Sequence, residues 1–323
     1  MTGAGTRLSV VLITSDGYSR LRKSVASLRR QPECRQMELI IASPSGLPDA
    51  REEDWSDFAR VLVVKTGPFR GVGHPSWEAT RHASAPIVVY VEDHAYVGDG
   101  WAAMLLKRHE EGFAAVAPAM LNGNPGPVSW ADFLLNFGPV VFPIRSGTSD
   151  YTPWHHTSYK RELLLECGAD LERMLAAEVG LETRLLRAGH RMWVDGGATV
   201  SHVNLSLWRS FLRGQFVGGR LYGAMRAEAE TWSVLRRLLY VVMAPLIPLW
   251  RAPRVAAHVA RTGAPGLNII FLAACVCGLT AATLGEVSGY LFGEGSMRRK
   301  RAWYEFSRES HVRPADIAVL HAD

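Results

Sequence analysis

Cysteine is scarce in this chain, and its placement excludes several kinds of site. The 323 residues include four cysteines, namely Cys34, Cys167, Cys275 and Cys277. They form no Cys-x-x-Cys pair and show no cysteine–histidine spacing typical of zinc ligation. The sequence therefore argues against a disulfide scaffold or a structural zinc centre, and it indicates reduced thiols in a cytosolic compartment.

The signatures of secretion and of nucleic-acid binding are also missing. The first seven residues are polar and lead into a strand pattern instead of an apolar signal-peptide core, so we expect no secretion. No helix-turn-helix, zinc-finger or RNA-recognition signature accompanies the net charge of +5, so we expect no nucleic-acid partner. A modest positive charge fits phosphate-bearing substrates or an anionic membrane surface equally well.

The first part of the chain alternates between strand and helix patterns. Short apolar, β-branched runs predict buried strands at residues 8–13, 38–42, 61–64 and 87–91. Between the first two runs, Leu21, Val25 and Leu28 recur at helical spacing. This alternation predicts an α/β fold with three layers, α/β/α, around a mostly parallel central sheet.

Glu92, Asp93 and His94 directly follow the strand predicted at residues 87–91. Open α/β sheets bind ligands at the carboxyl ends of their strands. Carboxylate oxygens suit Mg²⁺ or Mn²⁺, and these ions bind substrate phosphates. A lone acidic triplet would be more simply interpreted as a turn, but the flanking sequence favours a metal site.

The middle of the chain contains a loop and then a second α/β stretch. Residues 121–160 combine a Gly/Pro/Asn-rich loop with several aromatic side chains, which indicate an acceptor platform or ordinary core with equal weight. A helix is predicted at residues 177–188, followed by short strands at 191–194 and 198–200. Residues 205–225 have a helical pattern in which aromatic side chains alternate with arginines.

The composition becomes more apolar after residue 225. Residues 238–250 form an apolar run of 13 residues broken by two prolines, whereas a bilayer span needs ~20. Residues 267–285 are uncharged and just long enough to span a bilayer. A hairpin of two membrane spans would place three arginines on the outer side of the membrane, against the positive-inside rule. We therefore expect amphipathic or re-entrant helices on the cytoplasmic face of the cell membrane; the alternative is a soluble helical subdomain or dimer interface.

Several ordered segments together resemble the family 2 glycosyltransferases, which have the GT-A fold. Residues 9–14 resemble the opening strand that holds the nucleotide base, and residues 38–43 resemble the second strand. Glu92-Asp93-His94 stands at the position of the DxD motif, and His202 stands where a histidine often completes the metal site. Residues 156–161 resemble the acceptor-side segment, and residues 177–189 resemble the helix that carries the catalytic base.

The resemblance implies a division of the chain and a set of site residues. The expected parts are a GT-A catalytic domain at 1–225, a membrane-associated helical region at 226–301 and a C-terminal tail at 302–323. The residues implied are Thr14, Ser15, Asp16, Ser43, Glu92 and Asp93 for the donor, Asp93, His94 and His202 for a divalent cation, Glu178 as base, and His156, Tyr159 and Arg161 on the acceptor side.

The implied reaction moves a sugar from a nucleotide-diphosphate donor to the hydroxyl of a lipid-linked or cell-surface glycan, with inversion. The carboxylate of Glu178 would accept the hydroxyl proton, with Glu182 one turn later as the alternative base. A divalent cation, Mn²⁺ or Mg²⁺, would neutralise the diphosphate leaving group, and the imidazole of His94 favours Mn²⁺.

The sequence departs from the family pattern at several positions. Ser43 stands where many members have an aspartate that contacts the base, and Trp77-Glu78 stands where many have Arg-Asn. Ala177 replaces the first acid of a Glu-Asp pair. His94 stands where a DxD motif has its second acid. The departures at positions 43, 77 and 94 give weight to a non-catalytic glycan-binding or scaffold protein, and a nucleotidyltransferase on a similar sheet is a further alternative.

Overall fold

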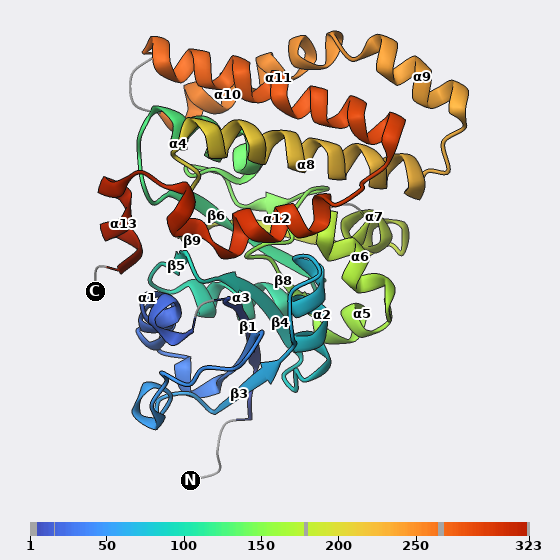
Figure 1. Ribbon diagram of the computed structural model, residues 1–323. Helices are drawn as coiled ribbons and strands as arrows, with labels where there is room; N and C mark the ends of the chain where they lie inside the picture. Colours follow the sequence, from blue (N-terminus) through green and yellow to red (C-terminus); the bar gives the residue numbers. More distant parts are fainter. Residues whose placement is uncertain (1–4, 16, 178–179, 264–267, 322–323) are drawn as a thin grey trace.

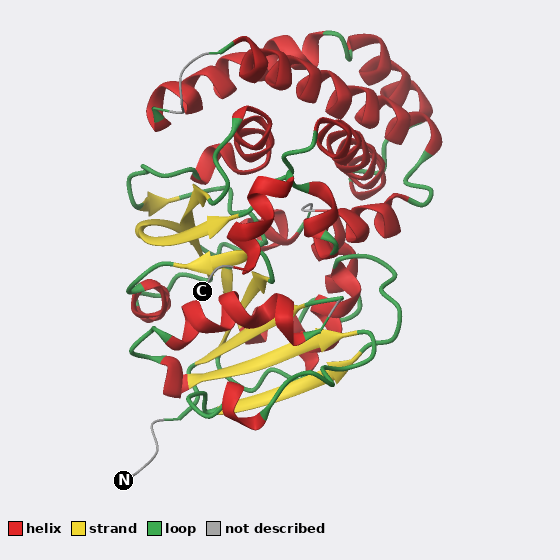
Figure 2. Ribbon diagram, turned by 60° about the vertical axis from the view of Figure 1, so that its left-hand side comes forward, coloured by secondary structure: helices red, strands yellow, loops and turns green. Residues whose placement is uncertain are grey.

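The computed structural model of the protein describes residues 5–15, 17–177, 180–263 and 268–321 (Figure 1). An α/β part that contains the amino-terminal residues lies on one side, and a layer of long helices lies on the other. The carboxyl-terminal helices cross between these two parts, as both ribbon views show (Figures 1 and 2).

One twisted sheet contains all the named strands. Their order is β3-β2-β1-β4-β8-β6-β9-β5, with β7 paired to β9. The strands are β1 Leu8–Ile13, β2 Met37–Ser43, β3 Arg60–Lys65, β4 Ile87–Glu92, β5 Ala95–Val97, β6 Ala115–Asn122, β7 Gly147–Thr148, β8 Ser158–Lys160 and β9 Met192–His202. Strands β1 to β4, β6 and β9 run in one direction, and β5, β7 and β8 run in the other, which confirms the predicted mostly parallel sheet.

Helices cover both faces of this sheet. They are α1 Tyr18–Arg29, α2 Gly73–Arg81, α3 Trp101–Glu110, α5 Arg161–Leu165, α6 Asp170–Ala177 and α7 Leu181–Arg187. In β1, Val10 and Leu12 belong to one hydrophobic core and Val11 and Ile13 to another, because successive side chains point to opposite faces. A strand that is buried on both faces needs a continuous apolar run, and this is why the first strand could be predicted from sequence.

Strand β9 is longer than the two short strands predicted in its place. Its pairing with β6 shifts so that Pro118 and Ala119 face Asp195 and Thr199, which leaves residues 196–198 outside the regular ladder. A Cβ on Gly196 would lie 2.2 Å from the carbonyl oxygen of Ile144, so this irregularity needs a glycine. The two predicted strands are therefore the ends of one bulged strand.

The second part of the molecule is a helical layer above the sheet (Figure 1). It consists of α4 Pro127–Phe137, α8 Trp208–Ala229, α9 Val234–Met243, α10 Leu246–Thr262 and α11 Ile269–Phe292. By length and composition, α11 is the one helix in the described part of the chain that could itself cross a membrane, and α9 with α10 forms an apolar pair bent by 62°. Core helices of soluble proteins share these properties, and α11 packs along α8 and α4.

The carboxyl-terminal residues return to the α/β part. They form α12 Met297–Phe306, the 3₁₀ helix η4 Arg308–His311 and α13 Pro314–His321. The Ser15 hydroxyl donates to the carbonyl oxygen of Phe306 at 2.7 Å, and Leu320 is buried beside Tyr96 of β5. This segment therefore packs against the carboxyl ends of the central strands, where the sequence predicts the functional site.

Candidate functional site

The sheet brings one carboxylate and two imidazoles to a single point. Glu92 is the last residue of β4, and His202 is the last residue of β9. Because β9 pairs with β5 in a register that places His202 opposite Ala95, His202 also lies beside His94. One ligand atom from each of Glu92, His94 and His202 lies within 4.8 Å of the others, which makes this group a candidate metal centre.

The distances within this group fit a divalent cation. Oε2 of Glu92 lies 3.1 Å from Nε2 of His202 and 3.6 Å from Nε2 of His94. Two ligand atoms that each lie about 2.1 Å from one ion are separated by about 3.0–3.4 Å in octahedral or tetrahedral geometry. The two distances from Glu92 therefore lie close to those expected for ligands of one ion.

The hydrogen bonds of His202 leave its Nε2 without a proton in the neutral ring. The Asn204 amide nitrogen donates to the His202 carbonyl at 2.9 Å, which fixes the amide so that its oxygen lies 2.8 Å from Nδ1 of His202. Nδ1 must therefore carry the proton, and the lone pair of Nε2 faces the carboxylate oxygen of Glu92. Two acceptors in contact repel each other unless a cation lies between them, so this pair fits a metal ion.

His94 has the same arrangement. Its Nδ1 lies 2.9 Å from the carboxylate of Asp93, which accepts a hydrogen bond from the ring N–H and leaves a lone pair on Nε2, the atom that lies 3.6 Å from Oε2 of Glu92. Burial, together with the neighbouring Arg308, lowers the pKa of His94 well below its usual range, so the ring is neutral at pH 7. Asp93, predicted as a metal ligand, instead lies behind His94, where such a carboxylate orients a metal-binding imidazole.

Two further histidines surround Glu92. His155 lies with Nδ1 3.0 Å from Oε1, and His156 lies with Nε2 3.0 Å from Oε2. Burial alone would raise the pKa of Glu92, but the imidazoles of His155 and His94 and hydrogen bonds from His155 and His156 hold it well below its usual range. The carboxylate is therefore ionised, as a metal ligand must be.

His156 combines burial with backbone strain. It has φ +66°, a left-handed conformation that is uncommon outside glycine, and its side chain is fully buried. Its Nδ1 has no hydrogen-bond partner in the described part of the chain. The sequence predicts an acceptor-side role for His156, whereas the structure places its side chain directly on the carboxylate of the candidate metal centre.

Three of the residues predicted to bind the donor lie at the carboxyl ends of β1 and β2. Thr14 and Ser15 follow β1, and Ser43 ends β2 with its hydroxyl donating to the carbonyl oxygen of Gly46 at 3.0 Å. Asp16 lies outside the described residues. The structure thus gathers Thr14, Ser15 and Ser43 at the edge of the sheet that also holds Glu92, and their donor-binding role remains a prediction.

Two of the predicted acceptor residues, Tyr159 and Arg161, lie away from this centre. Glu178 lies outside the described residues, and Glu182 lies in the first turn of α7. Tyr159 is buried in the core with its ring 6.3 Å from that of Tyr90, and Arg161 begins α5. Neither Tyr159 nor Arg161 lines the small cavity beside Glu92.

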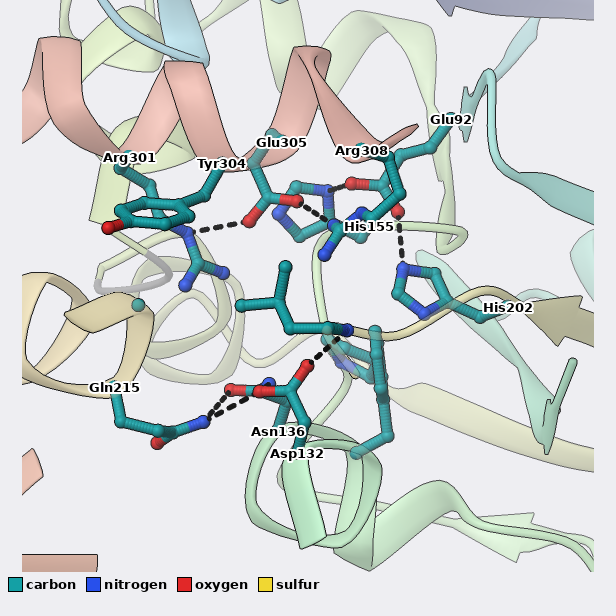
Figure 3. A pocket seen from close by; sticks show the side chains of 14 residues that line it. Glu92, Asp132, Asn136, His155, His202, Gln215, Arg301, Tyr304, Glu305 and Arg308 are labelled. Carbon is teal, nitrogen blue, oxygen red and sulfur yellow. Dashed lines mark hydrogen bonds and ion pairs between the residues drawn. The ribbon is translucent and has the colours of Figure 1, made fainter. Parts of the chain in front are cut away.

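That cavity contains side chains that the sequence did not identify (Figure 3). Its volume is about 30 Å³, and besides Glu92, His155 and His202 it is lined by Asp132, Asn136, Gln215, Arg301, Tyr304, Glu305 and Arg308. One signal could have identified Asp132, which is the lone charge within the apolar sequence of α4. Burial raises the pKa of Asp132, and its carboxylate accepts hydrogen bonds from Gln215, Asn136 and the backbone of Leu205.

A larger cavity adjoins the small one within the helical layer. Its volume is about 400 Å³, and it shares Asn136, Gly214, Gln215 and Arg301 with the cavity beside Glu92. Helices α4, α8, α10 and α11 supply most of its walls, which combine leucines with the cationic side chains of Arg251 and Arg254. A molecule bound there would reach the candidate metal centre from the side of the helical layer.

Comparison with known proteins gives a structural similarity. No protein-family model matches the chain, and no curated protein matches it. Among solved structures it is similar to the mannosyltransferase PcManGT from Pyrobaculum calidifontis in complex with GDP-Man and Mn²⁺, with 17% identity, a TM-score of 0.52 and coverage of 93% of this chain and 88% of that one. Residues 1–349 of S. aureus TarS in complex with UDP match with 14% identity, a TM-score of 0.44 and coverage of 91% and 92%. The similarity to the mannosyltransferase establishes the fold of the chain as GT-A-like.

Proposed function

We propose that this protein is a metal-dependent, inverting glycosyltransferase of the family 2 type that uses a nucleotide-diphosphate sugar. One observation carries the proposal: at the carboxyl ends of the strands, Nε2 of His94 and Nε2 of His202 lie 3.6 and 3.1 Å from the carboxylate of Glu92, and the other ring nitrogen of each histidine contacts Asp93 or Asn204. The mannosyltransferase with the same fold was crystallised with GDP-Man and Mn²⁺, which supports a nucleotide sugar and a divalent cation here.

The chain's own residues would divide the chemistry among themselves. Glu92, His94 and His202 would hold the divalent cation, and Asp93 and Asn204 would keep the two imidazoles in the required tautomer. When bound, the cation supplies positive charge to the diphosphate as it leaves.

Transfer itself needs one base. The acceptor oxygen forms a bond to the anomeric carbon while the bond from that carbon to the diphosphate oxygen breaks, and the hydroxyl proton passes to a carboxylate. Direct displacement of this kind inverts the anomeric carbon. Glu178 remains the proposed base and Glu182 the alternative.

The adjoining cavity supports an acceptor that is part apolar and part anionic, as a lipid-linked acceptor is. Arg251 forms an ion pair with Glu286, whereas the guanidinium of Arg254 lies 3.6 Å from the ring centroid of Trp250. Apolar walls suit a lipid chain, and the Arg254 guanidinium suits a phosphate beside it. The acceptor hydroxyl would then approach Glu92 through the four residues that the two cavities share.

A thermal-shift panel tests the proposed function. We expect one class of UDP-, GDP- or dTDP-sugar to raise the melting temperature in the presence of Mn²⁺ and to have little effect without it, because binding to the folded state stabilises it. His202→Ala should remove the Mn²⁺-dependent part of the shift. Release of nucleoside diphosphate from the same mixtures would support transfer, release of pyrophosphate would indicate a nucleotidyltransferase, and folded protein that responds to no nucleotide would contradict the proposal.

We also propose that the helical layer docks on the cytoplasmic face of the cell membrane. Large apolar side chains are exposed along α9, α10 and α11, among them Leu235 and Val242 of α9, which are 79% and 74% exposed. Arg236, Arg237 and Arg254 flank this surface, as expected for helices that lie on anionic lipid.

Vesicle binding checks the docking proposal. Leu235→Glu combined with Val242→Glu places two charges on one face of α9, and we expect binding to phosphatidylcholine–phosphatidylglycerol vesicles to weaken by at least about tenfold. Leu186→Glu is the matched control, since Leu186 is an exposed leucine on α7 outside this surface. Unchanged binding of the double variant, or a lipid-free dimer that the double variant disrupts, would contradict membrane docking.

A further inference from the structure

Arg308 occupies the coordination position of His94. Its Nη2 lies 2.8 Å from Nε2 of His94, and its side chain is 5% exposed. Guanidinium donates hydrogen bonds and cannot accept them, so the Nε2 lone pair of His94 is the acceptor. This is the same lone pair that the neutral His94 would offer to a metal ion.

The guanidinium of Arg308 is held in place by a buried carboxylate. Arg308 donates to Oε2 of Glu305 at 2.6 Å, and Arg301 contacts Oε1 of the same residue at 2.7 Å. Figure 3 shows Arg308 and Glu305 side by side on the segment that crosses above Glu92. Since Glu305 has two cationic partners, it remains paired if either one is removed.

The segment that carries Arg308 also covers the donor side of the sheet. The carbonyl oxygen of Phe306 accepts a hydrogen bond from the hydroxyl of Ser15. The ring centroid of Phe306 lies 4.8 Å from that of Phe69. Glu309 forms an ion pair with Arg20 of α1. With these contacts in place, the cavity beside Glu92 has a volume of about 30 Å³. A nucleotide sugar needs far more room.

One lone pair cannot serve two partners. A cation bound to Nε2 of His94 excludes the N–H of Arg308 from the same position, and two positive charges at that distance repel each other. We propose that Arg308 is a built-in substitute for the divalent cation, so that cation binding requires its withdrawal and loosens residues 297–311 from the donor side of the sheet. This inference rests on the proposed metal centre and adds its regulation by the carboxyl-terminal segment.

Coupling of this kind is reciprocal. If the bound cation displaces Arg308 from His94, then a change that weakens the contact of Arg308 with His94 should strengthen cation binding. The prediction can therefore be tested without donor or acceptor, by measuring Mn²⁺ affinity in variants of the segment.

We expect Arg308→Met to bind Mn²⁺ about tenfold more tightly than the wild-type protein, because the competing donor to His94 is gone. Titration followed by the electron paramagnetic resonance signal of free Mn²⁺ measures this. Arg301→Met is the matched control, since it removes an equal charge from the same carboxylate, Glu305. Its affinity should change by less than about threefold, because the N–H of Arg308 that competes for His94 remains in place.

The possible results separate this inference from the proposed function. Equal affinities in the wild-type protein and Arg308→Met would overturn the inference and leave the metal centre intact. An equal gain in both arginine variants would also overturn it, since charge alone would explain the gain. Absence of Mn²⁺ binding in every variant would overturn the metal centre and the inference together. If Arg308→Met does not fold, Glu305→Gln weakens the anchor of Arg308 and should give a smaller gain of the same sign.

Hydrogen–deuterium exchange tests the loosening itself. In the wild-type protein, Mn²⁺ should increase exchange in peptides that cover residues 297–311, although ligands usually slow exchange. In Arg308→Met, these peptides should exchange faster from the start and respond little to Mn²⁺. Slower or unchanged exchange in the wild-type protein when Mn²⁺ is bound would show that the cation and the docked segment coexist, and would overturn the proposal.

Discussion

Replacing Glu92 by glutamine is expected to abolish tight Mn²⁺ binding and to reduce sugar transfer by at least about a hundredfold. The carboxylate is the one anionic group in the cluster of Glu92, His94 and His202. Glutamine preserves the size of the side chain but removes the charge, and its amide cannot replace an anionic ligand between two imidazoles. Mn²⁺ titration and nucleoside diphosphate release measure the two effects separately.

Glu38→Gln is the matched control for this experiment. Glu38 is also a buried carboxylate in the sheet, and it accepts hydrogen bonds from Ser9, Ser84 and the backbone of Ala85. Burial would raise the pKa of Glu38, but these hydrogen bonds outweigh burial and lower it, so Glu38→Gln also removes a buried charge. We expect a loss of stability with Mn²⁺ binding retained. Loss of Mn²⁺ binding in both variants, or in neither, would contradict the assignment of Glu92.

The part of the site that could be predicted from sequence lies at the ends of strands. Glu92 and His94 follow an apolar run that is easily identified, and His202 ends the last long strand, so a parallel sheet must bring them to one edge. The sequence around each strand end therefore predicts both which side chains form the site and where in the fold they lie. The same reasoning predicts the first four strands, because each contains a run of apolar residues, which is buried in β1, β2 and β4 and half-buried in β3.

The part that could not be predicted depends on contacts between distant segments. Arg308 reaches His94 across a sequence separation of 214 residues, from a segment whose polar composition predicts a tail. His156 lies in a motif that resembles an acceptor-side segment, and only its left-handed backbone turns the imidazole onto Glu92. No periodicity or spacing in the sequence indicates either contact.

In the helical layer, too, the helices could be predicted from sequence but the contacts between them could not. The sequence predicts apolar helices after residue 225, but it does not show that α8 and α11 pack with their backbones in contact. A Cβ on Gly219 would lie 2.1 Å from the carbonyl oxygen of Ala282, and one on Gly285 would lie 2.2 Å from that of Phe216. Both helices therefore use glycine at their interface, as closely packed helices do. This interface holds Gln215 of α8 over the cavity beside Glu92.

Gly285→Ala is accordingly expected to destabilise the protein by at least about 2 kcal/mol, because one methyl group must push two helices apart. Gly218→Ala, one residue from Gly219 in α8, is the control: its Cβ would meet only the flexible end of Arg301 at 3.3 Å. There alanine should add about 0.5–1 kcal/mol through its higher helix propensity. Denaturant unfolding followed by tryptophan fluorescence gives both values. Similar changes in the two variants would show that helix propensity, and not backbone contact between α8 and α11, decides the role of these glycines.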